Sequence, residues 1–546
     1  MLFNSYEFVF LFLPATLTGF FLLGKTSRAW ALGWLIVASL FFYAWWRPLN
    51  VLIIAPSILV NFALARVLLR LRSDQARTRT ARLVLALGIV FNIAFLGYFK
   101  YVNFFSTVVN DVAGTHFFLE HVILPLGISF ITFQKIAFLI DVHAQRIESF
   151  SLRDYCLFVL FFPQLIAGPI VHYREMMPQF QKASCRFDKE SVALGLTLFL
   201  MGLFKKVVLA DGVAAHVSPI YDAVATGGDA SLFTAWMAAV GFTLQIYFDF
   251  SGYTDMALGL ARCFGVRLPP NFDSPLKASS IIDFWLRWHM TLTRFLTAYL
   301  YNPLVLWLTR RRLAAGKPVL GGRDARIGGA YLHLLAGPTI LTMFVSGLWH
   351  GAGYVFILWG LLHGLYLSIN HAWRMVGPRL WPDKASYNRF MRPVGFVLTF
   401  IAVAVAMVLF RSPTVGTASE LLQGMLGFNG ITLPQQIFER LGPLTSVLQP
   451  IVSPSVTSAG SGAEFIATTM WIFALLVIAL ALPNSLQILS RYEPAIGVKR
   501  RDEELDGWAR VLDWRPTLPW AFLMSAIAVT SIIKLGGKSE FLYWQF

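Results

Sequence analysis

Long apolar runs recur along the whole chain, and they constrain its fold more than any other feature. A helix that crosses a bilayer needs about 20 consecutive, mostly apolar residues. Several runs are short, or are interrupted by glycine, proline or charge, so some need not cross. The sequence predicts an all-α, polytopic transmembrane bundle of roughly 11–14 helices, some of them short, broken or horizontal. The candidate runs are residues 8–23, 30–46, 49–69, 83–99, 117–142, 155–171, 192–209, 232–248, 252–264, 281–308, 332–348, 354–369, 393–409, 465–482 and 518–533.

The composition supports a membrane environment. Of the 546 residues, 57% are hydrophobic and only 14% are charged, whereas a soluble domain carries about 25% charged residues. A net charge of +16 would suit nucleic-acid binding. However, the basic residues fall in short clusters between apolar runs, as in cytoplasmic loops, so we expect no nucleic-acid partner. The three cysteines, Cys156, Cys185 and Cys263, lack paired spacing and predict neither a disulfide framework nor a metal site.

The distribution of basic residues predicts how the chain crosses the membrane. The arginine-rich segment 66–82 contains one acid, Asp74, and is expected in the cytoplasm. Counting back across three helices places the N-terminus outside. Residues 412–464 have Arg440 as their only basic residue, so we expect an outer loop that contains one short helix. Residues 1–24 lack the basic start and the cleavage site of a signal peptide, and are expected to form a retained first helix.

Strongly polar side chains concentrate between residues 125 and 365. An ionisable group at membrane depth costs several kcal/mol unless it faces a bundle interior or a wet cavity, so it is a functional candidate by default. Gln134, Lys135 and Asp141 lie within one segment that is otherwise largely apolar. The segments that carry most of these groups are LPLGISFITFQKIAFLID (124–141), FPQLIAGPI (162–170), QIYFDFSGYTD (245–255), residues 271–302 with DFWLRWH (283–289), and SGLWHGAG (346–353).

Structural roles compete with function at these positions. A single histidine in an apolar helix is more often a packed core residue, which applies to His350 taken alone. Asp249 and Asp255 are six residues apart and do not share one helical face well, so buried hydrogen bonding is the favoured interpretation. Trp288 and Trp349 would serve equally as packing residues. The glycines beside His350 favour function, because they would let a substrate approach the imidazole.

In combination, these motifs resemble the bacterial branch of the membrane-bound O-acyltransferase (MBOAT) family, which includes alginate and exopolysaccharide O-acetyltransferases. The resemblance spans roughly residues 1–410, and neither histidine motif would suffice alone. We accordingly divide the chain into N-terminal transmembrane helices (1–115), a catalytic core (116–372) and C-terminal transmembrane helices (373–546). The matching segments are MLFNSYEFVFLFLP (1–14), FFYAWW (41–46), FPQLIAGPI (162–170), YFDFSGYTDMALGLA (247–261), DFWLRWHMTL (283–292), YLYNPL (299–304) and GLWHGAG (347–353).

The resemblance implies roles for individual residues. The invariant histidine of the family's Trp-His-Gly motif falls on His350, and the histidine of its Arg-Trp-His motif falls on His289. The helices are expected to enclose a tunnel through which an acyl group passes from a cytosolic thioester, typically acetyl-CoA, to an outward-facing acceptor. No permanently bound cofactor and no metal are expected. Supporting or tunnel-lining roles would fall on Trp349, Trp288, Asp283, Arg287, Asp249, Asp255 and Gln164.

The two histidines suit this chemistry. Acyl transfer to a hydroxyl needs a general base that titrates near the working pH, and histidine is the natural choice. A neutral imidazole also costs less to bury than a carboxylate. We expect His350 to take the proton of the acceptor hydroxyl, and His289 to orient the substrate or stabilise the oxyanion. A covalent acetyl-histidine is an open alternative.

The resemblance also implies a cellular setting. The protein would lie in the bacterial inner membrane and act toward an extracytoplasmic polysaccharide, alginate-like or another cell-surface glycan. An SGNH-type acetyltransferase on the outer face would be its partner.

Other functions remain open. A relative within the same class would transfer D-alanine to teichoic acid. A transporter or flippase would use Lys135, Asp249 and Asp255 as ion or substrate sites, but no internal repeat supports duplicated halves. A scaffold without activity is disfavoured, because both histidines are retained.

Overall fold

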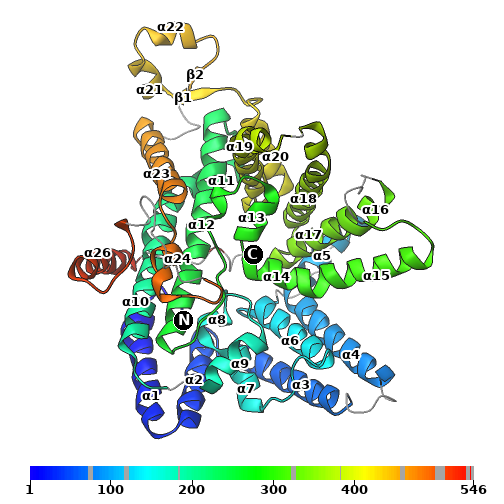
Figure 1. Cartoon of the computed structure of the whole chain (residues 1–546). Helices are drawn as coiled ribbons and strands as arrows, with labels where there is room; N and C mark the ends of the chain where they lie inside the picture. The colour runs from blue at the N-terminus through cyan, green and yellow to red at the C-terminus, as the bar shows by residue number, and fades with distance from the viewer. Residues whose placement is uncertain are drawn as a thin grey trace. The chain divides into compact units, whose positions relative to one another are not determined.

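A computed structural model gives the fold of this chain. It describes residues 1–546 with the exception of 72–77, 116–121, 183–184, 321–327, 382, 456–460, 499–510, 537–541 and 543–546. Segments 66–82 and 412–464, to which the sequence assigned opposite sides of the membrane, therefore lie partly outside the described residues. Within the described residues, the only sheet is a pair of three-residue strands (Figure 1). The predicted all-α class is confirmed.

Eight helical segments of the described chain are long and apolar enough to cross a membrane, which confirms a polytopic protein. Two shorter apolar helices, Arg28–Ala44 and Leu518–Lys534, add to them. Together they fall slightly below the predicted roughly 11–14 helices. The eight segments are Phe8–Thr26, Leu49–Leu71, Thr78–Ala113, Lys189–Ala225, Gly329–His350, Tyr354–Leu380, Lys384–Arg411 and Gly462–Ala481.

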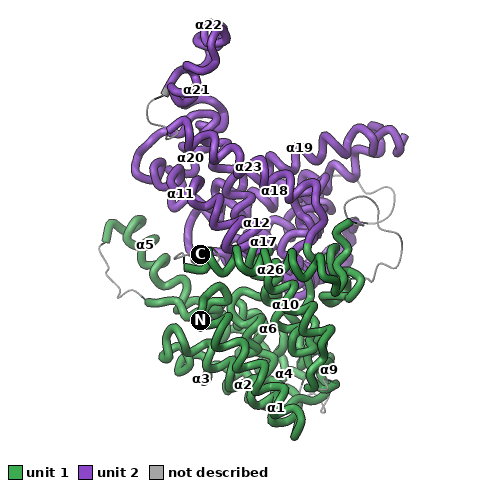
Figure 2. The backbone as a smooth tube through the Cα atoms, turned by 90° about the vertical axis from the view of Figure 1, so that its left-hand side faces the viewer, with its two compact units in different colours: residues 1–204, 251–271, 485–545 green, residues 205–250, 272–484, 546 purple. Residues whose placement is uncertain are grey.

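The chain forms two compact units that interleave along the sequence (Figure 2). Unit 1 comprises Met1–Phe204, Ser251–Asn271 and Ser485–Gln545. The three-part division predicted above follows sequence order instead and stays a prediction. The helices of unit 1 are η1 (Phe8–Phe12), α1 (Leu13–Thr26), α2 (Arg28–Ala44), α3 (Leu49–Leu71), α4 (Thr78–Leu96), η3 (Gly97–Tyr101), α5 (Val102–Ala113), α6 (Ile128–His143), α7 (Leu152–Leu160), α8 (Phe162–Leu165), α9 (Tyr173–Lys182), α10 (Lys189–Phe204), the end of α12 (Leu232–Cys263), α24 (Ser485–Ile488), η8 (Ser490–Tyr492) and α26 (Leu518–Lys534).

Unit 2 is formed mainly by Lys205–Phe250 and Phe272–Asn484. Its elements are η4 (Lys205–Ala210), α11 (Asp211–Ala225), most of α12, η5 (Pro275–Lys277), α13 (Ile281–Arg287), α14 (Met290–Leu296), η6 (Thr297–Tyr301), α15 (Asn302–Ala314), α16 (Gly329–Tyr331), η7 (Leu332–Ala336), α17 (Gly337–His350), α18 (Tyr354–Leu380), α19 (Lys384–Arg411), α20 (Val415–Met425), β1 (Thr432–Pro434), α21 (Gln435–Arg440), α22 (Leu444–Leu448), β2 (Ser453–Ser455) and α23 (Gly462–Ala481).

Small residues and paired amides hold the first helices of unit 1 together. α1 and α2 run side by side (Figure 1), and a side-chain carbon at Gly19 would lie 2.5 Å from the ring of Trp34. The indole nitrogen of Trp34 donates a 3.0 Å hydrogen bond to the Thr16 carbonyl. Between α3 and α4, the buried amides of Asn61 and Asn92 bond each other at 2.6 and 3.2 Å. Where no water competes, small residues and polar pairs are the usual contacts between membrane helices.

α12 is a single helix of 32 residues, where the sequence predicted two separate runs. The intervening Gly252 does not break it, because this part of α12 packs backbone to backbone on α10. A side-chain carbon at Gly202 would lie 2.5 Å from the Gly252 oxygen, and one at Gly195 would lie 2.6 Å from the Gly259 oxygen. These glycines are therefore packing positions between α10 and α12.

The run predicted over 155–171 does not form a spanning helix. It divides into α7 and the four-residue α8, with Phe161 between them in a non-helical conformation (ψ 108°). Pro163 is the second residue of α8, where its missing N–H and fixed φ suit a first helical turn.

The segment 412–464 contains more structure than the single short helix predicted for it. It includes α20, α21 and α22, and β1 pairs with β2 in parallel, Leu433 opposite Pro454. Within unit 2, α21 and α22 extend away from the longer helices in both views (Figures 1 and 2). Prolines at three of its turns or strands (Pro434, Pro443 and Pro454) divide this segment into short pieces.

Candidate active site

Two histidines from separate motifs meet inside unit 2. The ring centroids of His289 and His350 are 6.2 Å apart, at an interplanar angle of 59°. Both side chains are buried, with 1% and 5% of their surface exposed. They are 61 positions apart in the sequence. His289 directly precedes α14, and His350 is the last residue of α17. The predicted pair is thus close enough to act on one substrate.

The position of His350 depends on close packing of α17 against α18. A side-chain carbon at Gly347 would lie 2.2 Å from the Phe356 carbonyl oxygen, and one at Gly351 would lie 2.1 Å from the Phe356 ring. A carbon at Gly360 would lie 2.4 Å from the Met343 oxygen. The prediction that glycines beside His350 make room for a substrate is therefore wrong for Gly347 and Gly351. They make room for α18.

His289 lies at a break that the sequence did not predict. The run 281–308 was expected to be one apolar stretch, but α13 ends at Arg287 and α14 starts at Met290. Between them Trp288 is extended, and His289 has a left-handed backbone, with φ 43° and ψ 50°. This region is uncommon for a residue with a side chain and costs of order 1 kcal/mol. Such strain concentrates at functional sites, since the surrounding structure must enforce it.

Aromatic rings enclose the two imidazoles. Phe250 meets His289 edge-on at 4.8 Å, and the Trp349 ring lies 6.1 Å from His289 and 4.9 Å from His350. On the other side of His350, the rings of Trp359 and Phe410 lie at 5.0 and 5.3 Å. Trp349 therefore contacts both histidines, as its predicted supporting role requires. These rings surround both imidazoles and restrict their orientation.

A row of buried polar atoms leads away from His350 along α17 and α18. Thr342, Ser346 and His350 are spaced four residues apart and share one face of α17. The hydroxyls of Thr342 and Ser346, Nε1 of Trp359 and Nε2 of His363 are buried and have no hydrogen-bond partner among the described residues. Because buried polar groups are nearly always bonded, these atoms are suited to water or a polar ligand.

His363 was not among the predicted site residues. It is completely buried, its ring lies 4.8 Å from that of Trp359, and Trp285 donates a hydrogen bond to its Nδ1 at 3.3 Å. The four-residue spacing of Trp359 and His363 was the available signal, since it places both on the face of α18 that meets α17.

Asp283, Arg287 and Trp288 support the loop that precedes the histidine. Asp283 and Arg287 form a 2.8 Å ion pair one turn apart in α13, and both are partly exposed. Arg287 also exchanges backbone and side-chain hydrogen bonds with Asp273. Trp288 stacks on Phe284 at 5.6 Å. These contacts fix the geometry of the chain just before His289.

Asp249 belongs to a buried ionic cluster in unit 2. Lys206 lies 2.7 Å from Asp249 and 2.8 Å from Asp211, and the Lys206 and Asp249 side chains are 3% and 1% exposed. The charges compensate one another where water is excluded, which accords with the structural interpretation favoured for Asp249.

Asp255 and Gln164 belong to unit 1, whereas the histidines belong to unit 2. Asp255 accepts a 2.5 Å hydrogen bond from Ser485, and the Gln164 amide donates one of 2.6 Å to the Phe158 carbonyl. Ser485 and Phe158 also belong to unit 1.

Comparison with known proteins identifies the family. The profile of MBOAT, the membrane-bound O-acyltransferase family, matches residues 16–315, a range that includes His289 and ends before His350. A peptidoglycan O-acetyltransferase of Helicobacter pylori is 39% identical, over 79% of this chain and 81% of that protein. A probable alginate O-acetylase AlgI of Pseudomonas aeruginosa is 37% identical, over 78% of this chain and 75% of that protein.

A more distant relative is a teichoic acid D-alanyltransferase of Streptococcus thermophilus, 28% identical over 52% of this chain and 68% of that protein. All three names describe transfer of an acyl group. With a family profile over more than half of its length and relatives above 30% identity, this chain belongs to the membrane-bound O-acyltransferase family and is an O-acyltransferase.

Proposed function

We propose that this chain moves an acetyl group from a cytosolic thioester, acetyl-CoA, toward a hydroxyl of an extracytoplasmic polysaccharide. The observation that carries the proposal is the buried pair of His289 and His350, with ring centroids 6.2 Å apart. One imidazole acts on the acceptor hydroxyl and the other on the thioester carbonyl, so a single active site holds both reactants.

His350 is the general base. The acceptor oxygen attacks the thioester carbonyl carbon, and its proton passes to the imidazole of His350. His350 is the last residue of α17, and the carbonyl end of a helix favours a positive charge. The imidazolium that forms is therefore stabilised where it forms. A positioned general base contributes about 10²–10⁴-fold to such a reaction.

His289 donates a hydrogen bond to the oxyanion that develops on the thioester carbonyl. The intermediate collapses as the carbon–sulfur bond breaks, and His350 returns its proton to the departing thiolate. The strained backbone of His289 and the edge contact with Phe250 hold its ring in one orientation. A donor that needs no reorganisation stabilises developing charge effectively.

The polar row of Thr342, Ser346 and His363 supports a polar substrate beside His350. Names of relatives support the acceptor class, since peptidoglycan and alginate are both extracytoplasmic glycans. We propose that the acetyl group reaches the polymer with the help of an SGNH-type acetyltransferase on the outer face. The N-terminus would lie outside and the protein in the bacterial inner membrane.

Acetyl transfer in isolated membranes tests the proposal. Membranes with the unaltered chain should move radiolabel from acetyl-CoA to polysaccharide, and His350→Ala should lower the rate by about 10²-fold or more at equal protein level. His333→Ala is a matched control, because His333 is exposed on the same helical segment. Full activity of His350→Ala would refute the assignment.

The choice of labelled donor distinguishes acetyl transfer from D-alanyl transfer. Membranes supplied with the labelled D-alanyl thioester of a carrier protein would transfer D-alanine to the acceptor only if the D-alanyl alternative holds. A transporter would consume neither thioester.

A further inference from the structure

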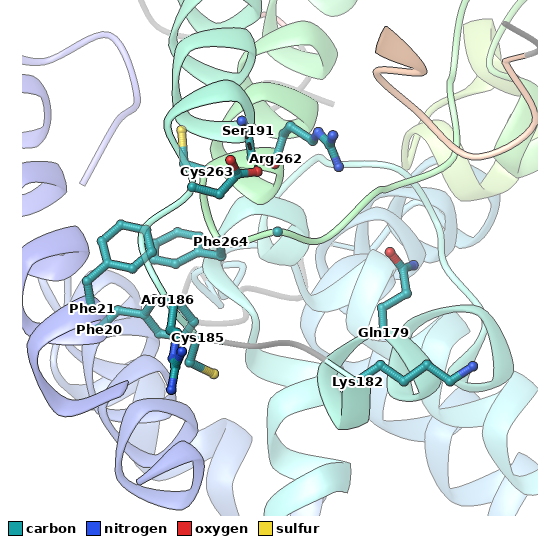
Figure 3. Close-up of a pocket in the computed structure, with 12 residues that line it drawn as sticks. Phe20, Phe21, Gln179, Lys182, Cys185, Arg186, Ser191, Arg262, Cys263 and Phe264 are labelled. Carbon is teal, nitrogen blue, oxygen red and sulfur yellow. Dashed lines mark hydrogen bonds between the residues drawn. The ribbon is translucent and has the colours of Figure 1, made fainter. Parts of the chain in front are cut away.

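Unit 1 contains two cavities of similar volume but different chemistry. The first, of about 420 Å³, has charged side chains near the ends of α9, α10 and α12 in its lining (Figure 3). The charged ends of Lys182, Arg186 and Arg262 point apart (Figure 3), and Asp188 caps α10 by accepting 3.3 Å hydrogen bonds from two backbone amides. These groups therefore do not form one binding site. The lining of the second cavity is almost entirely apolar.

The second cavity is a groove between α1 and α2, here called the α1–α2 groove, with a volume of about 410 Å³. Its α2 wall extends from Trp34 to Trp45, positions that lie about 16 Å apart along a helix. On the other wall, Leu11 belongs to the spanning segment Phe8–Thr26. Leu11 and Phe41 are 70% and 52% exposed, so the groove opens toward lipid hydrocarbon.

The dimensions of the α1–α2 groove suit one acyl chain. A helix is about 10 Å across, so about 16 Å of it would need on the order of 1,200 Å³ and would lie against the groove rather than in it. An extended peptide would bring unpaired backbone groups into hydrocarbon. The carbonyl of Thr16 in the lining already accepts a 3.0 Å hydrogen bond from Trp34. An acyl chain has no such groups, and one leaflet contributes a matching depth of about 15 Å to the hydrocarbon core.

One end of the α1–α2 groove carries a carboxylate and an indole. Because α1 and α2 lie side by side and are joined at Ser27, the residues before η1 lie near the end of α2. Glu7 and Trp45 line the groove at this end. Glu7 is exposed and forms no ion pair with a described residue. The Met1 amine is near enough to attract it, but donates its hydrogen bond to the Phe42 carbonyl at 3.4 Å.

This end of the groove matches a lipid headgroup that carries an ammonium. A carboxylate accepts strong hydrogen bonds from a primary ammonium, and the face of an indole attracts cations. A quaternary ammonium has no N–H to donate, and Glu7 would repel an anionic headgroup. Tryptophan is also common at the level where headgroups meet hydrocarbon.

We propose that the α1–α2 groove binds a bilayer phospholipid whose headgroup ends in a primary ammonium, of the phosphatidylethanolamine type. One acyl chain lies between α1 and α2, and Glu7 and Trp45 hold the ammonium. The site lies within unit 1 and shares no residue with the histidine pair, so it does not depend on the transferase assignment.

Native mass spectrometry of the full chain, purified in detergent, tests the headgroup. The protein is titrated with phosphatidylethanolamine, phosphatidylcholine and phosphatidylglycerol of identical acyl chains, and the bound lipid is quantified. Phosphatidylethanolamine should bind about tenfold more tightly than the other two, and Glu7→Gln should remove that preference. Glu439→Gln is the matched control, because it removes an exposed carboxylate of α21 outside the groove.

A second variant tests the acyl chain. Ala15 is exposed and lines the groove, so Ala15→Phe should fill it and weaken phosphatidylethanolamine binding about tenfold. Val90→Phe is its control, because it adds a ring at an exposed position of another spanning segment. The proposal is overturned if phosphatidylethanolamine is not preferred, if Glu7→Gln binds it like Glu439→Gln, or if Ala15→Phe binds it like Val90→Phe.

Discussion

The indole nitrogen of Trp285 lies 3.3 Å from Nδ1 of His363 and donates a hydrogen bond to it. An indole can only donate, so Nδ1 accepts and a neutral His363 carries its proton on Nε2. That atom is one of the buried polar atoms without a partner in the described structure. The His363 ring contacts Trp359 at 4.8 Å, and Trp359 contacts His350 at 5.0 Å. The Trp285 ring also lies 5.9 Å from that of Trp359. Trp285 is therefore connected to the proposed base through Trp359, both directly and by way of His363.

Trp285→Phe tests this connection. It removes one hydrogen bond and keeps an aromatic ring, so we expect a loss of about 1 kcal/mol in the free energy of unfolding. Acetyl transfer should fall about three- to tenfold, much less than in His350→Ala. Trp373→Phe is the control, because it removes the Trp373–Tyr387 hydrogen bond from an exposed part of α18. Equal activity of the two variants would contradict the connection.

Removing one partner of the Lys206–Asp249 pair should strongly destabilise the fold. Lys206→Met leaves a buried carboxylate without its main counter-charge and should destabilise the fold by about 3–5 kcal/mol. The double variant Lys206→Met/Asp249→Asn removes both charges and should recover much of that loss. Thermal unfolding in detergent measures both. If the double variant instead has normal stability but no acetyl transfer, Asp249 has a role in the reaction.

Helix packing at Gly360 predicts sensitivity to a single methyl group. In Gly360→Ala the new carbon would lie 2.4 Å from the Met343 carbonyl oxygen, so α17 and α18 must separate. Overpacking of this kind costs about 1–3 kcal/mol, and it should displace His350 and lower acetyl transfer. Gly353→Ala is the control, because its new carbon meets nothing closer than 3.6 Å. The prediction fails if both variants have the same melting temperature and rate.

The cap of α10 predicts a pH dependence of stability. Hydrogen bonds from Ser191, first its hydroxyl and then its amide, lower the pKa of the exposed Asp188 carboxyl. A lowered pKa means that the stabilisation is fully present above the unfolded pKa of about 3.9 and is lost as the pH falls through the folded value. Asp188→Asn keeps cap hydrogen bonds but does not titrate.

The unaltered chain should be more stable than Asp188→Asn by a constant amount from about pH 5 to 8, and this difference in stability should decrease below about pH 4. Because the group is exposed, solvent screening keeps the difference small. Melting temperatures across that range measure it, and a difference independent of pH would count against the prediction.

Much of the architecture could be predicted from the sequence because apolar runs report directly on membrane helices. The same method failed at glycines, because a glycine can either interrupt a helix or leave open space, or it can allow another helix to pack closely. Gly252 looked like a boundary, yet it lies within one helix because α10 packs on its backbone. Gly347 and Gly351 looked like room for a substrate, yet Phe356 occupies that space. Only the neighbouring helix distinguishes these cases, and hydropathy carries no information about it.

The site could be predicted in part. His289 and His350 were recognised from their motifs, and the structure brings them together. The turn at His289 could not be predicted, since nothing in the run 281–308 marks a left-handed residue. His363 was missed because a lone histidine in an apolar helix is more often a packed core residue, and its four-residue spacing from Trp359 was not used. Lys206, likewise, is recognisable as a partner of Asp249 only once η4 and α12 are folded together.

The order of segments in unit 1 has a consequence for biosynthesis. Residues 1–204 are translated before α26, which packs on α10 but follows the long unit 2 segments in the sequence. The early helices must remain in the bilayer, with one face of α10 uncovered, until α26 has been made. Assembly of this unit is therefore expected to wait for α26, and termination before Leu518 should harm the part of the protein that was made first.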